Sequence, residues 1–102
     1  MHYGFDENNK PVKLLDVSEV EVWLKSKKRL LKRDAVQDYQ VSTVFLVMDH
    51  SLNILEMHSD PILWETMIFG YDDDNYQERY TSYEAAMAGH QRAIDFLLGK
   101  VR

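Results

Sequence analysis

The segment from Val41 to Met48 constrains the fold of this chain more than any other. It is rich in β-branched and aromatic residues, which favour the pleated, half-buried surface of a β-strand. Its alternate positions form two faces, and both faces are largely apolar. A strand that is apolar on both sides is typical of the middle of a sheet that a helix covers on at least one face. The segment therefore predicts a central strand.

Two later segments supply partners for this strand. Ile62 to Phe69 has the same apolar and aromatic character and ends at Gly70, before a stretch of turn residues. Tyr76 to Tyr80 would return as a third, short strand. These three strands predict an antiparallel meander.

The amino-terminal residues predict a hairpin and a first helix. Met1–Phe5 and Pro11–Leu14 read as short strands around a turn at Asn8-Asn9. The helix would begin between Asp16 and Ser18, with a capping box formed either by Asp16 and Glu19 or by Ser18 and Glu21. It should end within the basic residues that follow, after which the chain looks extended.

The last helix has the clearest signals. Thr81 at the N-cap with Glu84 three residues later forms a capping box, and Gly99 supplies a stop. An apolar stripe at helical spacing runs along it: Tyr83, Ala86, Met87, His90, Ile94 and Leu97. The sequence as a whole predicts an α+β fold, with an antiparallel β-meander, an N-terminal hairpin and two helices packed on one face. At 102 residues it forms one domain, residues 1–102.

Composition excludes several classes of protein. There is no cysteine, so disulfides and thiolate chemistry are excluded and a cytoplasmic location is expected. The longest uncharged stretch, Tyr39 to Met48, is far shorter than the roughly 20 residues of a membrane span, and no signal peptide is visible. The net charge of −5 argues against general nucleic-acid binding.

The charge distribution is uneven. Positive charge gathers between Lys25 and Arg33, where no acid interrupts it. Such asymmetry marks a candidate anion-facing patch. The alternative is a solvated helix end, where lysines lie near the negative pole of the helix dipole.

Motifs spread along the whole chain resemble a family of small uncharacterised bacteriophage and prophage proteins. They are VSTVFL from Val41, Asp49-His50, WETMIFG from Trp64, ERY from Glu78, Glu84-Ala85, Gly89-His90 and the opening YGFDENNKPVKL from Tyr3. The resemblance implies a phage origin and expression in the cytoplasm of a bacterial host, but no established activity. In that family the loop between Asp49 and Trp64 is usually rich in glycine and proline, whereas here it is stiffer and more apolar.

Metal and enzyme sites find little support in the sequence. His50, His90 and Glu65, or Asp49 with His50 and His58, offer suitable ligands, but their spacing matches no compact metal motif, so we expect no metal or other cofactor. Glu65, Asp49 and His90 would be the acid–base set of a small hydrolase if they converged. A packed, hydrogen-bonded His90 is the alternative, with Gly89 allowing close approach of helix and sheet. A buried Glu65 would need a partner, either His90 or Arg79.

Binding is the remaining interpretation. Aromatic, cationic and hydroxyl side chains of the kind that hold nucleotides occur at or beside the predicted strands. The candidate ligand-binding residues are Asp49, His50, Trp64, Glu65, Thr66, Arg79, Tyr80 and His90. The leading hypothesis is a phage accessory protein, acting in counter-defence, that binds a small anionic nucleotide-like molecule, with a homodimer interface as one place for the site. The alternative is a protein that inhibits a host protein through its acidic surface, for example the loop Asp72 to Asp74.

Overall fold

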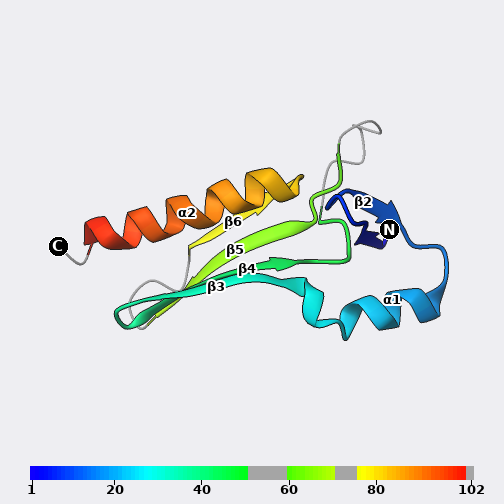
Figure 1. Cartoon of the computed structure of the whole chain (residues 1–102), viewed down its shortest axis with the longest axis horizontal. Helices are drawn as coiled ribbons and strands as arrows, with labels where there is room; N and C mark the ends of the chain where they lie inside the picture. The colour runs from blue at the N-terminus through cyan, green and yellow to red at the C-terminus, as the bar shows by residue number, and fades with distance from the viewer. Residues whose placement is uncertain (51–59, 71–75, 101–102) are drawn as a thin grey trace.

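A computed structural model describes residues 1–50, 60–70 and 76–100, and it confirms the α+β fold (Figure 1). The elements in chain order are β1 (Tyr3–Phe5), β2 (Pro11–Lys13), α1 (Val17–Leu24), the 3-10 turn η1 (Lys27–Arg29), β3 (Leu30–Val36), β4 (Tyr39–Phe45), β5 (Trp64–Phe69), β6 (Gln77–Tyr80) and α2 (Tyr83–Lys100). The extended segment after the first helix is β3. It adds a fourth strand to the predicted meander.

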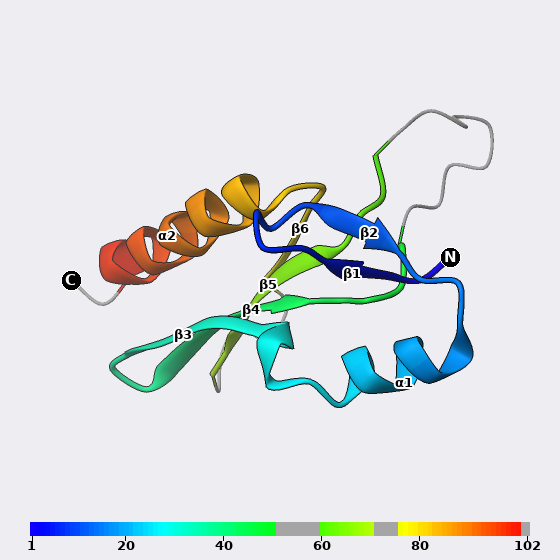
Figure 2. The same cartoon turned by 45° about the vertical axis from the view of Figure 1, so that its right-hand side comes forward.

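The strands form two antiparallel sheets. β1 and β2 pair as the predicted hairpin, and β3 to β6 form a four-stranded sheet in sequence order. α2 lies across one face of this larger sheet and contacts all four of its strands (Figure 1). α1 contacts β1 and η1 at the end of the sheet and lies well apart from α2 (Figure 2). Its Trp23 ring packs against Phe45, a residue of the face that α2 also covers.

The helix caps resolve the alternatives that the sequence left open. The Asp16 carboxylate accepts a hydrogen bond from the Ser18 backbone N–H at 2.8 Å, so Asp16 is the N-cap of α1. The cap of α2 is Ser82, whose hydroxyl accepts from the Ala85 N–H at 3.1 Å, and the assignment of Thr81 was wrong by one residue. Gly99 lies inside α2 and does not stop it.

β4 ends three residues before the predicted strand does, because the backbone turns sharply at Val47. The Met48 N–H donates to the Leu46 carbonyl at 2.7 Å, which closes a three-residue γ-turn, and Val47 has φ of 68°. Positive φ is strained for a β-branched residue. Tertiary contacts hold the turn: the Val47 side chain is fully buried, and its carbonyl accepts from the Tyr3 N–H at 2.7 Å.

The core lies between α2, the hairpin and the sheet. Two clusters of buried apolar residues share it. One, around Phe45, Trp64 and Tyr80, extends under the hairpin, where Phe5 packs edge to face against Phe45 and the Trp23 ring packs against it at a tilt. The other, around Val41 and Ile68, lies under the second half of α2 with Ala93 and Leu97.

The opposite side of the large sheet carries no helix or strand of the described residues over its middle. We call it the open face. Residues that pair directly across neighbouring strands point to the same side, which assigns its members: Leu30, Arg33, Ala35, Gln40, Ser42, Val44, Glu65, Met67, Phe69, Gln77 and Arg79.

Candidate functional site

A chain of buried polar side chains joins α2 to three strands. The His90 Nδ1 atom lies 2.6 Å from the Thr43 hydroxyl, which lies 2.5 Å from the Thr66 hydroxyl. On the other side of the ring, His90 Nε2 lies 2.7 Å from an Asp34 carboxylate oxygen. A carboxylate only accepts, so Nε2 donates to Asp34. We call Asp34, His90, Thr43 and Thr66 the buried hydrogen-bond chain.

The close approach of α2 to the sheet makes this chain possible. A Cβ atom added to Gly89 would lie 2.0 Å from the Tyr80 hydroxyl oxygen, so only glycine fits at this position of the helix. The neighbouring His90 can therefore reach Thr43 in the middle of the sheet. Burial also raises the pKa of Tyr80 above its usual value, because the charged phenolate is poorly solvated there.

The order carboxylate, imidazole, hydroxyl is the order used by hydrolases that activate a hydroxyl nucleophile. Reactivity of that kind requires that a substrate reach the hydroxyl. The side chains of His90, Thr43 and Thr66 have 0% exposure, and the Thr43 hydroxyl also contacts Thr66. Only Asp34 meets solvent, with its side chain 39% exposed. The arrangement therefore suits packing and not attack on a substrate.

Glu65 is paired, and its partner is Arg79. Arg79 Nε donates to a Glu65 carboxylate oxygen at 2.8 Å, and the Gln77 amide donates to the same oxygen at 2.6 Å. The Glu65 side chain is 9% exposed and that of Arg79 is 37% exposed. Both lie on the open face, on the side of the sheet away from His90. Glu65 and His90 therefore do not converge.

Asp49 and His50 secure the chain where it leaves β4. The Asp49 carboxylate accepts from the Ile62 N–H at 2.9 Å, and its own N–H donates to the Met1 carbonyl at 3.0 Å. The His50 N–H donates to the Ile62 carbonyl at 3.0 Å. Asp49 therefore ties together segments from three parts of the sequence.

The eight predicted ligand-binding residues thus lie in three places. Thr66, His90, Trp64 and Tyr80 lie between α2 and the sheet, Glu65 and Arg79 lie on the open face, and Asp49 and His50 lie at the end of β4. Within the described part of the chain, no group of three His, Asp or Glu side chains is placed to hold a metal ion. His58 and the loop Asp72 to Asp74 lie outside the described residues.

The basic residues from Lys25 to Arg33 divide into one structural side chain and several solvated ones. Arg29 donates to the carbonyl of Phe45 at 3.0 Å and to that of Leu24 at 3.1 Å, and it thereby fastens η1 to the end of β4. The lysines and Arg33 are exposed. Sequence reasoning treated the cluster as one unit and overlooked the role of Arg29, because a charge pattern does not reveal which side chain meets a carbonyl.

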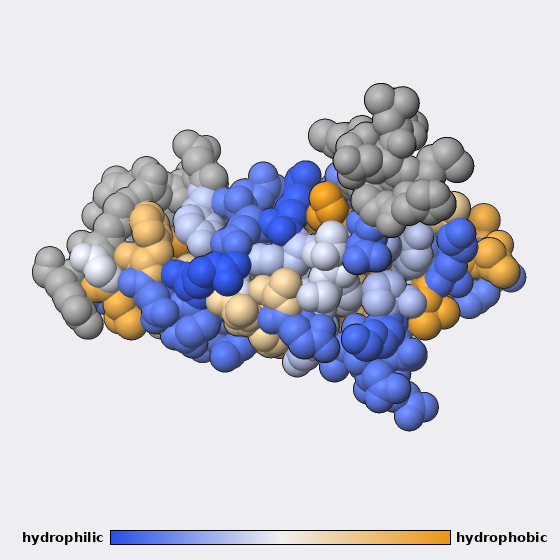
Figure 3. Space-filling model, turned by 90° about the horizontal axis from the view of Figure 1, so that it is seen from above, coloured by the Kyte–Doolittle hydropathy of each residue, from blue (hydrophilic) through white to orange (hydrophobic). Residues whose placement is uncertain are grey.

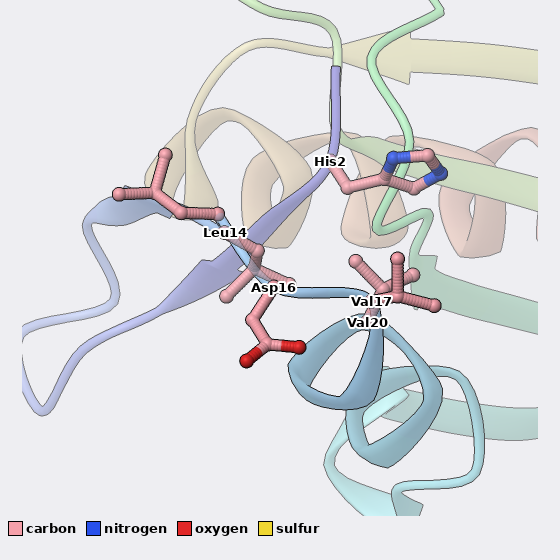
Figure 4. A pocket seen from close by; sticks show the side chains of 6 residues that line it. His2, Leu14, Asp16, Val17 and Val20 are labelled. Carbon is pink, nitrogen blue, oxygen red and sulfur yellow. The ribbon is translucent and has the colours of Figure 1, made fainter.

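Two small pockets lie among the described residues. One, of about 220 Å³, opens where α1 begins, beside β1 and the end of β2 (Figure 4). Its lining combines apolar side chains with one histidine and one carboxylate: His2, Leu14, Leu15, Asp16, Val17 and Val20. Drug-sized ligands occupy sites of about 300–1,000 Å³, so this pocket suits a single side chain better than a nucleotide. Its carboxylate already caps α1, and the hydrogen bonds from Ser18 lower the pKa of Asp16.

The open face carries an apolar band. Phe69 is 48% exposed and Leu30 is 46% exposed, and the partly buried Val44 and Met67 lie between them. Sequence reasoning missed this surface. The signal that could have found it is the apolar outer face of the central strands, which a helix on one side leaves uncovered on the other.

The surface above α2 contrasts with the open face. Seen from that side, the middle of the molecule is largely hydrophilic, and apolar side chains gather toward its two ends (Figure 3). None of the described helices is long and apolar enough to cross a membrane. The chain matches no protein-family model, no curated protein and no solved structure.

Proposed function

We propose that the protein acts by binding another protein, and that the open face is its contact surface. The observation that carries this proposal is the apolar band of the exposed Leu30 and Phe69 and the partly buried Val44 and Met67, across a sheet whose other face is already covered. Contiguous apolar surface of this kind marks interaction sites in soluble proteins. The setting is the one that the sequence resemblance implies, an accessory protein of a bacteriophage that works in the host cytoplasm.

The composition of the open face is that of a protein interface. Met67 lies in its middle row, Phe69 lies at the end of β5, and two arginines, Arg33 and Arg79, lie on the edge strands. Interfaces are enriched in aromatic residues, Met and Arg, and their cores are poor in unpaired charge. The one acid, Glu65, is already paired with Arg79 and Gln77, so covering it would leave no bare carboxylate.

Binding of a nucleotide-like anion stays a prediction. Three of the residues proposed to bind this anion, Trp64, Thr66 and His90, each have at most 1% of their surface exposed. Arg79 and its neighbours on the open face are therefore the side chains that would meet such a ligand.

Capture from a bacterial lysate tests the proposed function. The immobilised protein would be exposed to lysate of cells that also make an untagged copy of the same chain, and retained proteins would be identified by mass spectrometry. Phe69→Arg places a charge in the apolar band, whereas Leu98→Arg places the same charge on an exposed position of α2. We expect at least one protein to be retained by the wild type and by Leu98→Arg but lost with Phe69→Arg. Equal retention by both variants would contradict the proposal.

A further inference from the structure

We infer that the segment joining α1 to β3 is a second contact surface, which takes an acidic segment of a partner protein. Four lysines of this segment, Lys25, Lys27, Lys28 and Lys32, are called the basic turn. They lie where the chain leaves α1, passes through η1 and enters β3 (Figure 2). The inference goes beyond the proposed function, because none of these lysines belongs to the open face.

The charges of the basic turn have no partner in the described part of the chain. All four side chains are exposed, and none forms an ion pair or a hydrogen bond with another described residue. Glu19 and Glu21, the acids that precede them on α1, form no ion pair with them either. By contrast, Arg79 and Arg92 each pair with a glutamate. The basic turn is therefore a group of cations that the fold leaves unneutralised.

The backbone that carries these lysines is held at two points. The Ser26 hydroxyl caps η1 by accepting a hydrogen bond from the Lys28 N–H at 3.1 Å. Arg29 donates to the carbonyls of Leu24 and Phe45, which fixes η1 between the end of α1 and the end of β4. A surface whose backbone is already ordered loses less conformational freedom when it binds. On binding, the basic turn would have to order its side chains only.

The charge of the whole chain favours a short acidic segment over a long polyanion. The net charge is −5, and it becomes −9 when the four lysines of the basic turn are left out. DNA or RNA would extend past the turn and meet this acidic surface. A few carboxylates of a folded partner would meet the lysines alone, so charge complementarity is better for a protein.

Apolar side chains beside the basic turn also favour a protein partner. Leu24 and Leu30 flank η1 and are 45% and 46% exposed. The phosphates that dominate the binding of nucleic acids to lysines carry no apolar surface, whereas protein interfaces combine apolar contacts with a polar rim. Leu30 also belongs to the open face, so one partner can contact both surfaces.

Fluorescence anisotropy with two labelled probes tests the inference. One probe is a peptide of glutamates with a few leucines, and the other is a single-stranded oligonucleotide with the same number of negative charges. We expect the wild type to bind the peptide more tightly than the oligonucleotide. The double variant Lys27→Glu with Lys28→Glu should lose about 10-fold or more in peptide affinity. Lys27→Gln with Lys28→Gln should lose less, because it removes attraction without adding repulsion.

The matched control is Lys10→Glu with Lys13→Glu, which makes the same change in net charge at exposed positions of the hairpin. It should keep most of the peptide affinity at about 0.15 M salt, where screening confines charge effects to roughly 8 Å. Circular dichroism would verify that every variant is folded. Equal loss in the two glutamate variants would overturn the inference, since the peptide would then respond to total charge. Failure of the wild type to bind the peptide at about 1 mM, or tighter binding of the oligonucleotide, would overturn it too.

The inference and the proposed function fail separately. Phe69→Arg changes the open face and leaves the basic turn intact, so this variant should bind the peptide at least as tightly as the wild type. A Phe69→Arg protein that no longer binds the peptide would mean that the peptide occupies the open face. That result would contradict the assignment of the acidic segment to the basic turn.

Discussion

His90 shows how a residue type that suggests catalysis can serve packing. It lies on the buried stripe of α2 with 0% exposure, and both ring nitrogens have partners, in Asp34 and Thr43. Buried polar groups are tolerated when their hydrogen bonds are made, and removal of one partner then costs more than the bond itself contributes. The buried hydrogen-bond chain therefore fixes the position of α2 on the sheet more sharply than apolar contacts alone.

Replacement of His90 by Leu tests this role. His90→Leu keeps most of the side-chain volume but removes the contacts to Asp34 and Thr43, so we expect the free energy of unfolding to fall by about 1–3 kcal/mol. Urea denaturation followed by circular dichroism would measure it. Gln91→Leu, on the exposed side of the same helix, should change stability by less than about 0.5 kcal/mol. Equal stability of the wild type and His90→Leu would show that the hydrogen bonds do not stabilise the fold.

The sequence revealed single residues only in part. It named His90 as a candidate ligand-binding residue and offered a packed His90 as the alternative. It also indicated that Gly89 allows close approach and that a buried Glu65 needs a partner, because each of these rests on local chemistry. It did not indicate Asp34 or Thr43 as the partners of His90, since these residues lie 56 and 47 positions away in sequence. Hydrogen bonds at such separations follow from strand order and register.

At the scale of elements, the hydrophobic pattern predicted which segments form strands and which form helices. Where each element ends depends on backbone geometry, which the pattern does not reveal. The predicted strand from Val41 to Met48 is shortened by the γ-turn at Val47, a conformation that a valine-rich pattern gives no reason to expect. The turn between β3 and β4 likewise places Gln37 at φ of 53°, where glycine would be favoured. The position of α1 depended on Trp23, which packs against Phe5 and Phe45 and not beneath α2.

Two glycines of α2 provide a matched test of the helix–sheet approach. At Gly89 a new Cβ would meet the buried ring of Tyr80, and at Gly99 it would meet no atom within 4 Å. Alanine favours a helix over glycine by about 1 kcal/mol, so Gly99→Ala should stabilise the protein by up to that amount. Gly89→Ala should instead destabilise it by about 1–3 kcal/mol, because the ring cannot move without disturbing the core.

Thermal unfolding of the two variants under identical conditions would measure these effects. Opposite signs are expected. A Gly89→Ala protein as stable as Gly99→Ala would mean that α2 lies farther from Tyr80 than the structure shows.

At the scale of the whole molecule, the described residues place a helix layer on one face of the large sheet, and none of their helices or strands covers the middle of the other face. The chain extends 47 × 31 × 24 Å, with a radius of gyration of 14.7 Å, whereas a compact domain of this length is expected to have about 13 Å. The sequence could not predict this elongation, because it does not reveal where the two helices pack. Their positions decide which face of the sheet stays uncovered.

The two ends of the described chain lie at opposite ends of the long axis, and the strands run roughly along it (Figure 1). The hairpin and α1 therefore lie at one pole of the molecule, and the end of α2 lies at the other. Labels attached at the two poles would be separated by much of the 47 Å length of the chain.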